Sequence, residues 1–217
     1  MRFAATHLRL IRHAQIVATV LLALLGSSQV LAAPEKDSSL ETAIFAGGCF
    51  WCVEADFDKV PGVTETVSGY IGGHVANPSY KQVSRGGTGH IESVQITFDP
   101  SVTTFERLVY LFWRSVDPTD AGGQFCDRGE SYTTAIFVAS EEQRQVAETS
   151  KKALEASGSL EHTVVTPIRA ATEFWPAEMY HQNYYKRNKL RYKYYRNGCG
   201  RDKRVKALWG SEAWAAK

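Results

Sequence analysis

Residues 42–57 read TAIFAGGCFWCVEADF, and this stretch sets the expected fold. We expect an apolar strand over 42–46, a tight turn at the two glycines, and a helix from Cys49 to Lys59. Apolar side chains recur along that helix at helical spacing: Phe50, Val53, Phe57 and Val60. Cys49 therefore begins the helix, where unpaired backbone N–H groups and the helix dipole favour a thiolate. The bare glycine backbone before it predicts an accessible, reactive cysteine.

Strand and helix patterns alternate through the rest of the chain. Strand patterns occupy 63–70, 90–98, 132–139 and 164–168. Amphipathic helices are expected over 108–116 and from 141 to about 156, and a glycine-rich polar loop over 117–130. With no Rossmann glycine fingerprint, this order predicts an α+β fold. We expect a two-layer α/β sandwich, a ferredoxin-like α-β plait, with a long irregular C-terminal segment.

The first 32 residues have the pattern of a signal peptide. Three arginines precede an apolar run over 16–25, and Val30-Leu31-Ala32 offers a cleavage site. Export to the periplasm or beyond is the inference, with an uncleaved membrane anchor as the alternative. Residues 33–40 are a polar linker, and 41–217 are expected to be one catalytic domain. Because no other stretch is apolar enough to span a bilayer, the mature chain is predicted to be soluble, and we expect a monomer.

A basic, tyrosine-rich tract lies within the C-terminal tail, which begins near residue 180. Ten Lys or Arg and one Asp lie between Lys186 and Lys206, which could indicate a nucleic-acid surface. Removing residues 1–32 deletes three arginines and no acidic residue, so the net charge falls from +2 to −1. We therefore predict no nucleic-acid binding, and a solvated helix face followed by a mobile tail that carries Cys199.

Four cysteines, at positions 49, 52, 126 and 199, allow several kinds of chemistry. In an exported chain an even number is typical of structural disulfides, as in a stapled binding module. Cys49 and Cys52 also form a CxxC, which suggests a thiol-disulfide oxidoreductase or half a zinc site. Cys126 and Cys199 stand alone without a second CxxC, so no metal is predicted. The adjacent aromatics Phe50 and Trp51 cannot both face one core stripe, so at least one should line a site.

Four motifs together carry a resemblance to a known family. They are GCFWC at 48–52, GHIESV at 89–94, QFCDRGESY at 124–132 and YHQNY at 180–184. In combination they resemble peptide methionine sulfoxide reductase A over about residues 42–202. The resemblance implies reduction of the S epimer of methionine sulfoxide, free or in oxidised proteins. It also implies no bound cofactor, and thioredoxin or another dithiol as external reductant.

Site roles follow from the resemblance, residue by residue. Cys49 matches the nucleophile and Glu92 the acid that protonates the departing oxygen. Two hydroxyl donors, one aspartate and two pocket aromatics also match: Tyr80, Tyr132, Asp127, Phe50 and Trp51. To donate at neutral pH, Glu92 must be buried so that its charged form is disfavoured. Cys199 matches the resolving thiol that condenses with the sulfenic acid of Cys49.

The chain departs from the commoner family pattern at two cysteines. Cys52 stands where many members carry glycine, and Cys126 where many carry asparagine. Either is an alternative resolving thiol, or the two form a structural pair. A bridge from Cys49 to Cys52 is disfavoured because one helical turn holds the sulfurs in poor geometry. We therefore expect Cys199 to resolve.

Overall fold

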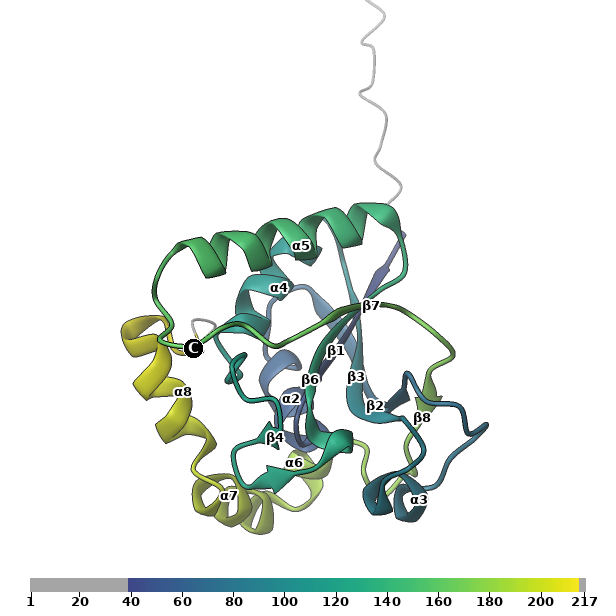
Figure 1. Ribbon diagram of the computed structural model, residues 1–217. Coiled ribbons are helices and arrows are strands. Elements are labelled where there is room, and N and C mark those ends of the chain that lie inside the picture. Colours follow the sequence, from purple (N-terminus) through teal and green to yellow (C-terminus); the bar gives the residue numbers. More distant parts are fainter. Residues whose placement is uncertain (1–38, 215–217) are drawn as a thin grey trace, which may run out of the picture. The chain divides into compact units, whose positions relative to one another are not determined.

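The computed structural model describes residues 39–214 of the chain. The predicted signal peptide, 1–32, and most of the linker lie outside the described residues. A six-stranded mixed sheet forms the centre, in the order β7-β6-β1-β3-β2-β8 (Figure 1). Its strands are β1 (Glu41–Gly47), β2 (Val63–Ile71), β3 (Ile91–Phe98), β6 (Thr134–Val138), β7 (Ile168–Ala170) and β8 (Trp175–Pro176). All neighbouring strands of this sheet are antiparallel, except that β6 and β7 are parallel. The predicted combination of helices with a central sheet is confirmed.

Helices are spread between and after the strands. They are α2 (Phe50–Phe57), α3 (Tyr80–Arg85), α4 (Phe105–Trp113), α5 (Glu141–Ala156), α6 (Tyr184–Arg187), α7 (Lys189–Gly198) and α8 (Arg201–Trp209). The short 3-10 helices η1 (Glu130–Tyr132) and η2 (Gly210–Glu212) complete the set. Among the small elements that were not predicted are α3 and β8, because a six-residue helix and a two-residue strand leave little periodicity to detect. Of the described helices, none combines the length and apolarity that crossing a membrane requires.

Side chains alternate between the two faces of the sheet. Phe45 of β1 and Val94 of β3 belong to the main core with α2 and α4, whereas Ala46 and Ile91 belong to a smaller cluster on the other face. Because the side-chain period of a strand is two, Glu92 points to the same face as Val94. It therefore lies under α2 in the core, and not on an open face of the sheet.

The C-terminal segment is helical and packed, which corrects the prediction of an irregular, mobile tail. Helices α7 and α8 lie together beside the domain, in yellow in Figure 1. Val205, Trp209 and Trp214 are buried in the main core. The basic composition of this tract concealed these few apolar residues, which recur at four- to five-residue intervals.

The expected loop over 117–130 contains a tight hairpin. Strands β4 (Gly123–Gln124) and β5 (Asp127–Arg128) pair with each other and leave Phe125 and Cys126 as the two loop residues. Phe125 has a φ of 56°, the left-handed conformation that such short loops require. The hairpin therefore presents Cys126 at its tip.

Candidate active site

Cys49 occupies the turn between β1 and α2, as the sequence predicted. It is the N-cap residue of α2, and its carbonyl accepts the N–H groups of Cys52 and Val53 at 3.0 and 3.3 Å. Gly48 has a φ of +80°, and a Cβ there would lie 2.5 Å from the Cβ of Gln124. Only glycine allows β1 to turn into α2 so closely against the hairpin.

A cavity of about 200 Å³ opens at this turn. It is lined by Cys49, Phe50, Trp51, Tyr80, Glu92, Asp127, Tyr132 and Tyr195. Seven of these eight were singled out from the sequence, although they come from five separate segments. Cys199 does not line the cavity, and Tyr195 was not predicted.

Glu92 is buried as expected, with only 2% of its surface exposed. Its Oε2 accepts the backbone N–H of Phe50 at 3.0 Å. Burial raises the pKa of the carboxyl well above its ordinary value, against the lowering effect of that N–H, and the nearby Asp127 raises it further. Burial therefore favours the protonated form of Glu92, which lines the cavity where it can act as a proton donor.

Cys49 is only 6% exposed, which corrects the expectation of an open thiolate at rest. Burial raises the pKa of the Cys49 thiol well above its ordinary value, and contact with Cys52 raises it further. Loss of solvent therefore outweighs the helix N-terminus in the empty cavity. A hydrogen bond with Tyr195 acts in the opposite direction and lowers the pKa of Cys49.

Phe50 and Trp51 both line the cavity, although only one was certain from their spacing. Phe50 is almost fully buried, whereas the Trp51 ring stacks on Tyr184, with centroids 3.8 Å apart. The Trp51 indole N–H donates to Nδ1 of His181 at 3.0 Å. His181 therefore holds one wall of the cavity in place, which is a positioning role.

Tyr80 and Tyr132 also line the cavity. Their hydroxyl groups hydrogen-bond with each other, and burial raises the pKa of both. Tyr80 begins α3, where its backbone N–H donates to Glu178 at 2.9 Å. Two neutral hydroxyls next to a protonated carboxyl can hydrogen-bond a single polar oxygen placed between them.

Tyr195 of α7 joins two other cavity residues. Its hydroxyl donates to Oδ2 of Asp127 and also contacts the Cys49 sulfur. Burial raises the pKa of Asp127, while the bond from Tyr195 lowers it. Tyr195 was missed because the packing of the C-terminal helices alone brings it to Cys49. In the sequence, the one feature that could have pointed to Tyr195 was the row of tyrosines within the basic tract.

We expect Tyr195→Phe to lower kcat about 10-fold, the effect of roughly one lost hydrogen bond. The substitution keeps the ring packed but removes the hydroxyl that orients Asp127 and contacts Cys49. Dithiothreitol-driven turnover measures this effect, and Tyr194→Phe is the matched control because Tyr194 is 84% exposed. Equal turnover rates for the two variants would contradict a role of the Tyr195 hydroxyl in the site.

Two arginines on either side of Cys199 fasten the C-terminal helices to the catalytic turn. Arg196 pairs with Asp56 of α2 at 2.8 Å. Arg201 is 2% exposed and donates to the carbonyl of Gly47 at 2.9 Å and to that of Ser115 at 3.0 Å. Cys199 is therefore held close to the cavity by groups on both sides of it.

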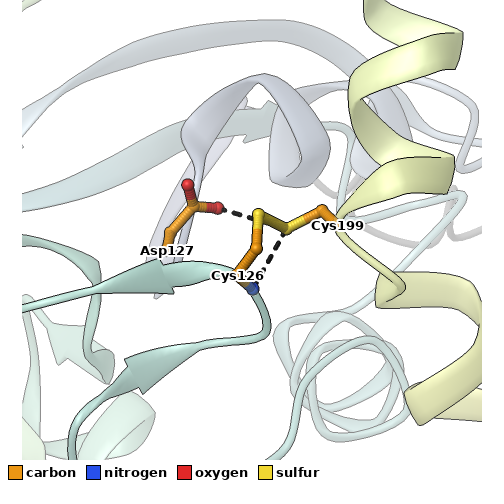
Figure 2. Close-up of side chains that lie close together, drawn as sticks. All are labelled: Cys126, Asp127 and Cys199. Atoms are coloured by element: carbon orange, nitrogen blue, oxygen red, sulfur yellow. Dashed lines mark hydrogen bonds between the residues drawn. A yellow bond between two sulfur atoms is a disulfide. The ribbon is translucent and has the colours of Figure 1, made fainter.

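Cys199 forms a disulfide with Cys126, with an S–S distance of 2.02 Å (Figure 2). The possible structural pair of Cys52 with Cys126 is therefore wrong, and Cys49 and Cys52 are free, buried thiols. That Cys199 resolves Cys49 stays a prediction. Among the described residues, one group could supply metal ligands: Cys126, Asp127 and Cys199. Disulfide sulfurs are not thiolate ligands, so the oxidised pair offers no such site.

Glu54 is another buried carboxyl of α2, one helical turn beyond Phe50 and Trp51, and it does not line the cavity. Its Oε1 accepts the N–H of Asn183, while Oε2 has no partner. Burial, with a smaller contribution from Asp58, raises its pKa to about 7, against the lowering effects of the Asn183 N–H and of Lys186. The native state thus binds this proton more tightly than the unfolded state, and Glu54 costs stability as pH rises from about 4.5 to about 7.

We expect Glu54→Gln to stabilise the protein at about pH 8 but not at about pH 5, by on the order of 2 kcal/mol. Glutamine keeps the acceptor for Asn183 and has no charge to bury. Urea unfolding of both proteins at the two pH values measures the difference. The same loss of stability between these pH values in wild type and variant would contradict the assignment.

A buried thiol that shares a cavity with a carboxyl of raised pKa and two tyrosine hydroxyls, within aromatic walls, defines a thiol-dependent oxidoreductase. The family model described as peptide methionine sulfoxide reductase matches residues 41–213. The chain belongs to this family.

Individual relatives agree with this assignment. The chain is 52% identical over 182 residues to peptide methionine sulfoxide reductase MsrA 2 of Rhizobium meliloti, covering 84% of this chain and 90% of the relative. It is 55% identical over 171 residues to MsrA of Listeria innocua, covering 79% and 97%. Among solved structures, methionine sulfoxide reductase A of Corynebacterium diphtheriae has a TM-score of 0.63 at 32% identity, covering 75% and 81%. Reduced Mxr1 of Saccharomyces cerevisiae has a TM-score of 0.64 at 28% identity, covering 70% and 88%.

Proposed function

We propose that this enzyme reduces the S epimer of methionine sulfoxide, free and within proteins, with Cys49 as the attacking thiol. Reduction of methionine sulfoxide itself follows from the family. One observation carries the assignment of roles. The buried Glu92, whose pKa is raised, and Cys49 line the same small cavity.

The residues divide the reaction between them. The substrate methyl group lies against Phe50 and Trp51, and the sulfoxide oxygen accepts hydrogen bonds from Tyr80, Tyr132 and Glu92. The Cys49 sulfur attacks the sulfoxide sulfur while Glu92 protonates the oxygen. In net terms the oxygen moves to Cys49, which becomes a sulfenic acid, and the sulfoxide becomes a thioether. The thiol proton of Cys49 returns Glu92 to its protonated form.

The sulfenic acid is then resolved by a second thiol. Cys199 attacks the Cys49 sulfur, a disulfide forms, and the oxygen leaves as water. The position of Cys199 between Arg196 and Arg201, both fastened to the catalytic turn, supports this assignment. A thioredoxin-like dithiol then reduces the enzyme, without a bound cofactor.

Turnover of each epimer of a blocked methionine sulfoxide, driven by dithiothreitol, tests the proposal. We expect the S epimer to be consumed and the R epimer to be left. Insulin reduction, run beside it, tests the alternative of a CxxC thiol-disulfide oxidoreductase, which needs no Glu92. Insulin reduction without sulfoxide turnover would reverse the assignment.

We also propose that the enzyme is exported and that it is a monomer. The arginines and apolar run of residues 1–32 support a signal peptide that directs the enzyme to the periplasm or beyond. Cell fractionation with mass analysis of the mature N-terminus tests the first point. Light scattering tests the second.

We also propose that the central strands form the ferredoxin-like plait. The chain order β1-α2-β2-β3-α4-β6 and the spatial order β6-β1-β3-β2 support this. In that reading β7 and β8 are additions at the two edges of the sheet. Comparison of strand order and crossover handedness with known plaits is the test.

A further inference from the structure

The two sulfurs of the Cys126–Cys199 disulfide differ in their surroundings. Cys126 lies at the tip of the β4–β5 hairpin and is exposed, whereas Cys199 follows α7 and is half-buried (Figure 2). An external dithiol therefore reaches the Cys126 sulfur first. This asymmetry gives the disulfide an outer and an inner end.

The inner end lies close to the catalytic cavity. The Cys199 sulfur is 3.7 Å from Oδ2 of Asp127, the oxygen that accepts the Tyr195 hydroxyl. That hydroxyl in turn contacts the Cys49 sulfur. Tyr195 and Cys199 lie one helical turn apart, joined by the bond from the Cys199 N–H to the Tyr195 carbonyl at 2.8 Å. Cys199 is thus separated from Cys49 by two contacting side chains.

The hairpin also favours one direction of thiol exchange. The backbone N–H of Cys126 donates to the Cys199 sulfur at 3.1 Å. When an external thiolate attacks Cys126, negative charge develops on Cys199, and this N–H stabilises it as the leaving group. A purely structural disulfide needs neither an exposed end nor an oriented leaving group.

We propose that Cys126 is a redox-active thiol of the catalytic cycle, which takes the disulfide over from Cys49 and passes it to the reductant. The proposal rests on the proposed function. After Cys199 has formed a disulfide with Cys49, the Cys126 thiolate attacks the Cys199 sulfur. The Cys49–Cys199 bond breaks, the Cys126–Cys199 bond forms, and Cys49 leaves as a thiolate that takes up a proton. A dithiol then attacks Cys126, releases Cys199, and closes its own disulfide, so two electrons enter for each sulfoxide reduced.

A burst experiment without reductant tests this sequence. Fully reduced wild type, mixed with excess methionine sulfoxide, should form about two methionines per enzyme, because Cys49 is freed once and then oxidised again. Cys126→Ser should form about one and stop with a Cys49–Cys199 disulfide, seen by peptide mapping. Its turnover driven by thioredoxin, thioredoxin reductase and NADPH should fall at least about 10-fold.

Cys52→Ser is the matched control, and we expect it to retain the burst of about two. Equal bursts for wild type and Cys126→Ser, or a burst lowered in Cys52→Ser instead, would overturn the proposal. Mapping wild type after one equivalent of substrate gives a test that needs no variant: we expect Cys126–Cys199 with a free Cys49. If no methionine forms in any protein, the proposed function fails, and not this inference. Thermal unfolding of Cys126→Ser against reduced wild type checks its fold.

Discussion

Cys49→Ser should lose at least about 10⁴-fold in methionine sulfoxide turnover, the largest effect of any single change in this protein. A serine hydroxyl is a far weaker nucleophile than a thiol toward sulfur, and it cannot form a sulfenic acid or a disulfide. Oxygen transfer and the first disulfide of the proposed cycle both require this one sulfur. Dithiothreitol-driven formation of methionine at saturating substrate measures the loss.

Cys52→Ala tests whether the loss of turnover is specific to the Cys49 sulfur or follows from removing any buried thiol. Cys52 is as buried as Cys49 and contacts it, but it does not line the cavity. We expect its removal to cost less than about 10-fold in turnover. If Cys52→Ala were as inactive as Cys49→Ser while remaining folded, the reaction would belong to the pair and not to Cys49 alone.

Glu92→Gln should lower kcat/KM for methionine sulfoxide by about 10²–10³-fold. Glutamine keeps the size of the side chain and an acceptor for the Phe50 N–H, so the cavity retains its shape. It has no proton to transfer to the sulfoxide oxygen. Because burial raises the pKa of Glu92, the wild type should lose activity as pH rises through that pKa, and the variant should lack this limb.

Glu54→Gln provides the matched control, because it changes an equally buried glutamate that does not line the cavity. We expect its turnover to stay within about 3-fold of wild type. Both substitutions replace a buried carboxyl with an amide, so a difference in turnover between the two variants reflects the place of Glu92 in the cavity. An unchanged pH profile in Glu92→Gln would assign the proton donor to another group.

Much of the candidate site was predictable because its residues are carried by short, regular elements. The alternation of β3 places Glu92 on the face of Val94, which is the buried face. Two glycines and the spacing of apolar residues place Cys49 at the start of α2. These features depend on neighbours within a few residues, so the sequence displays them directly.

Other features depended on segments that are far apart in the chain. The expected mobile tail is helical because Val205 and Trp209 pack in the main core and Arg201 binds the Gly47 carbonyl. The disulfide joins residues 73 positions apart, and four cysteines allow several pairings. No local pattern distinguishes one pairing from another.

By itself, the sequence determined the strand-turn-helix that holds Cys49 and a buried face of β3, and its motifs, through the family resemblance, identified seven of the eight residues around the cavity. Only the tertiary structure decided that Tyr195 contacts Cys49, that Cys199 pairs with Cys126, and that Cys49 rests as a thiol. Local backbone preference and side-chain periodicity act over a few residues, and they can be read along the chain. Disulfide partners and pKa values depend on which distant groups surround an atom and how much water they exclude, and folding alone sets both.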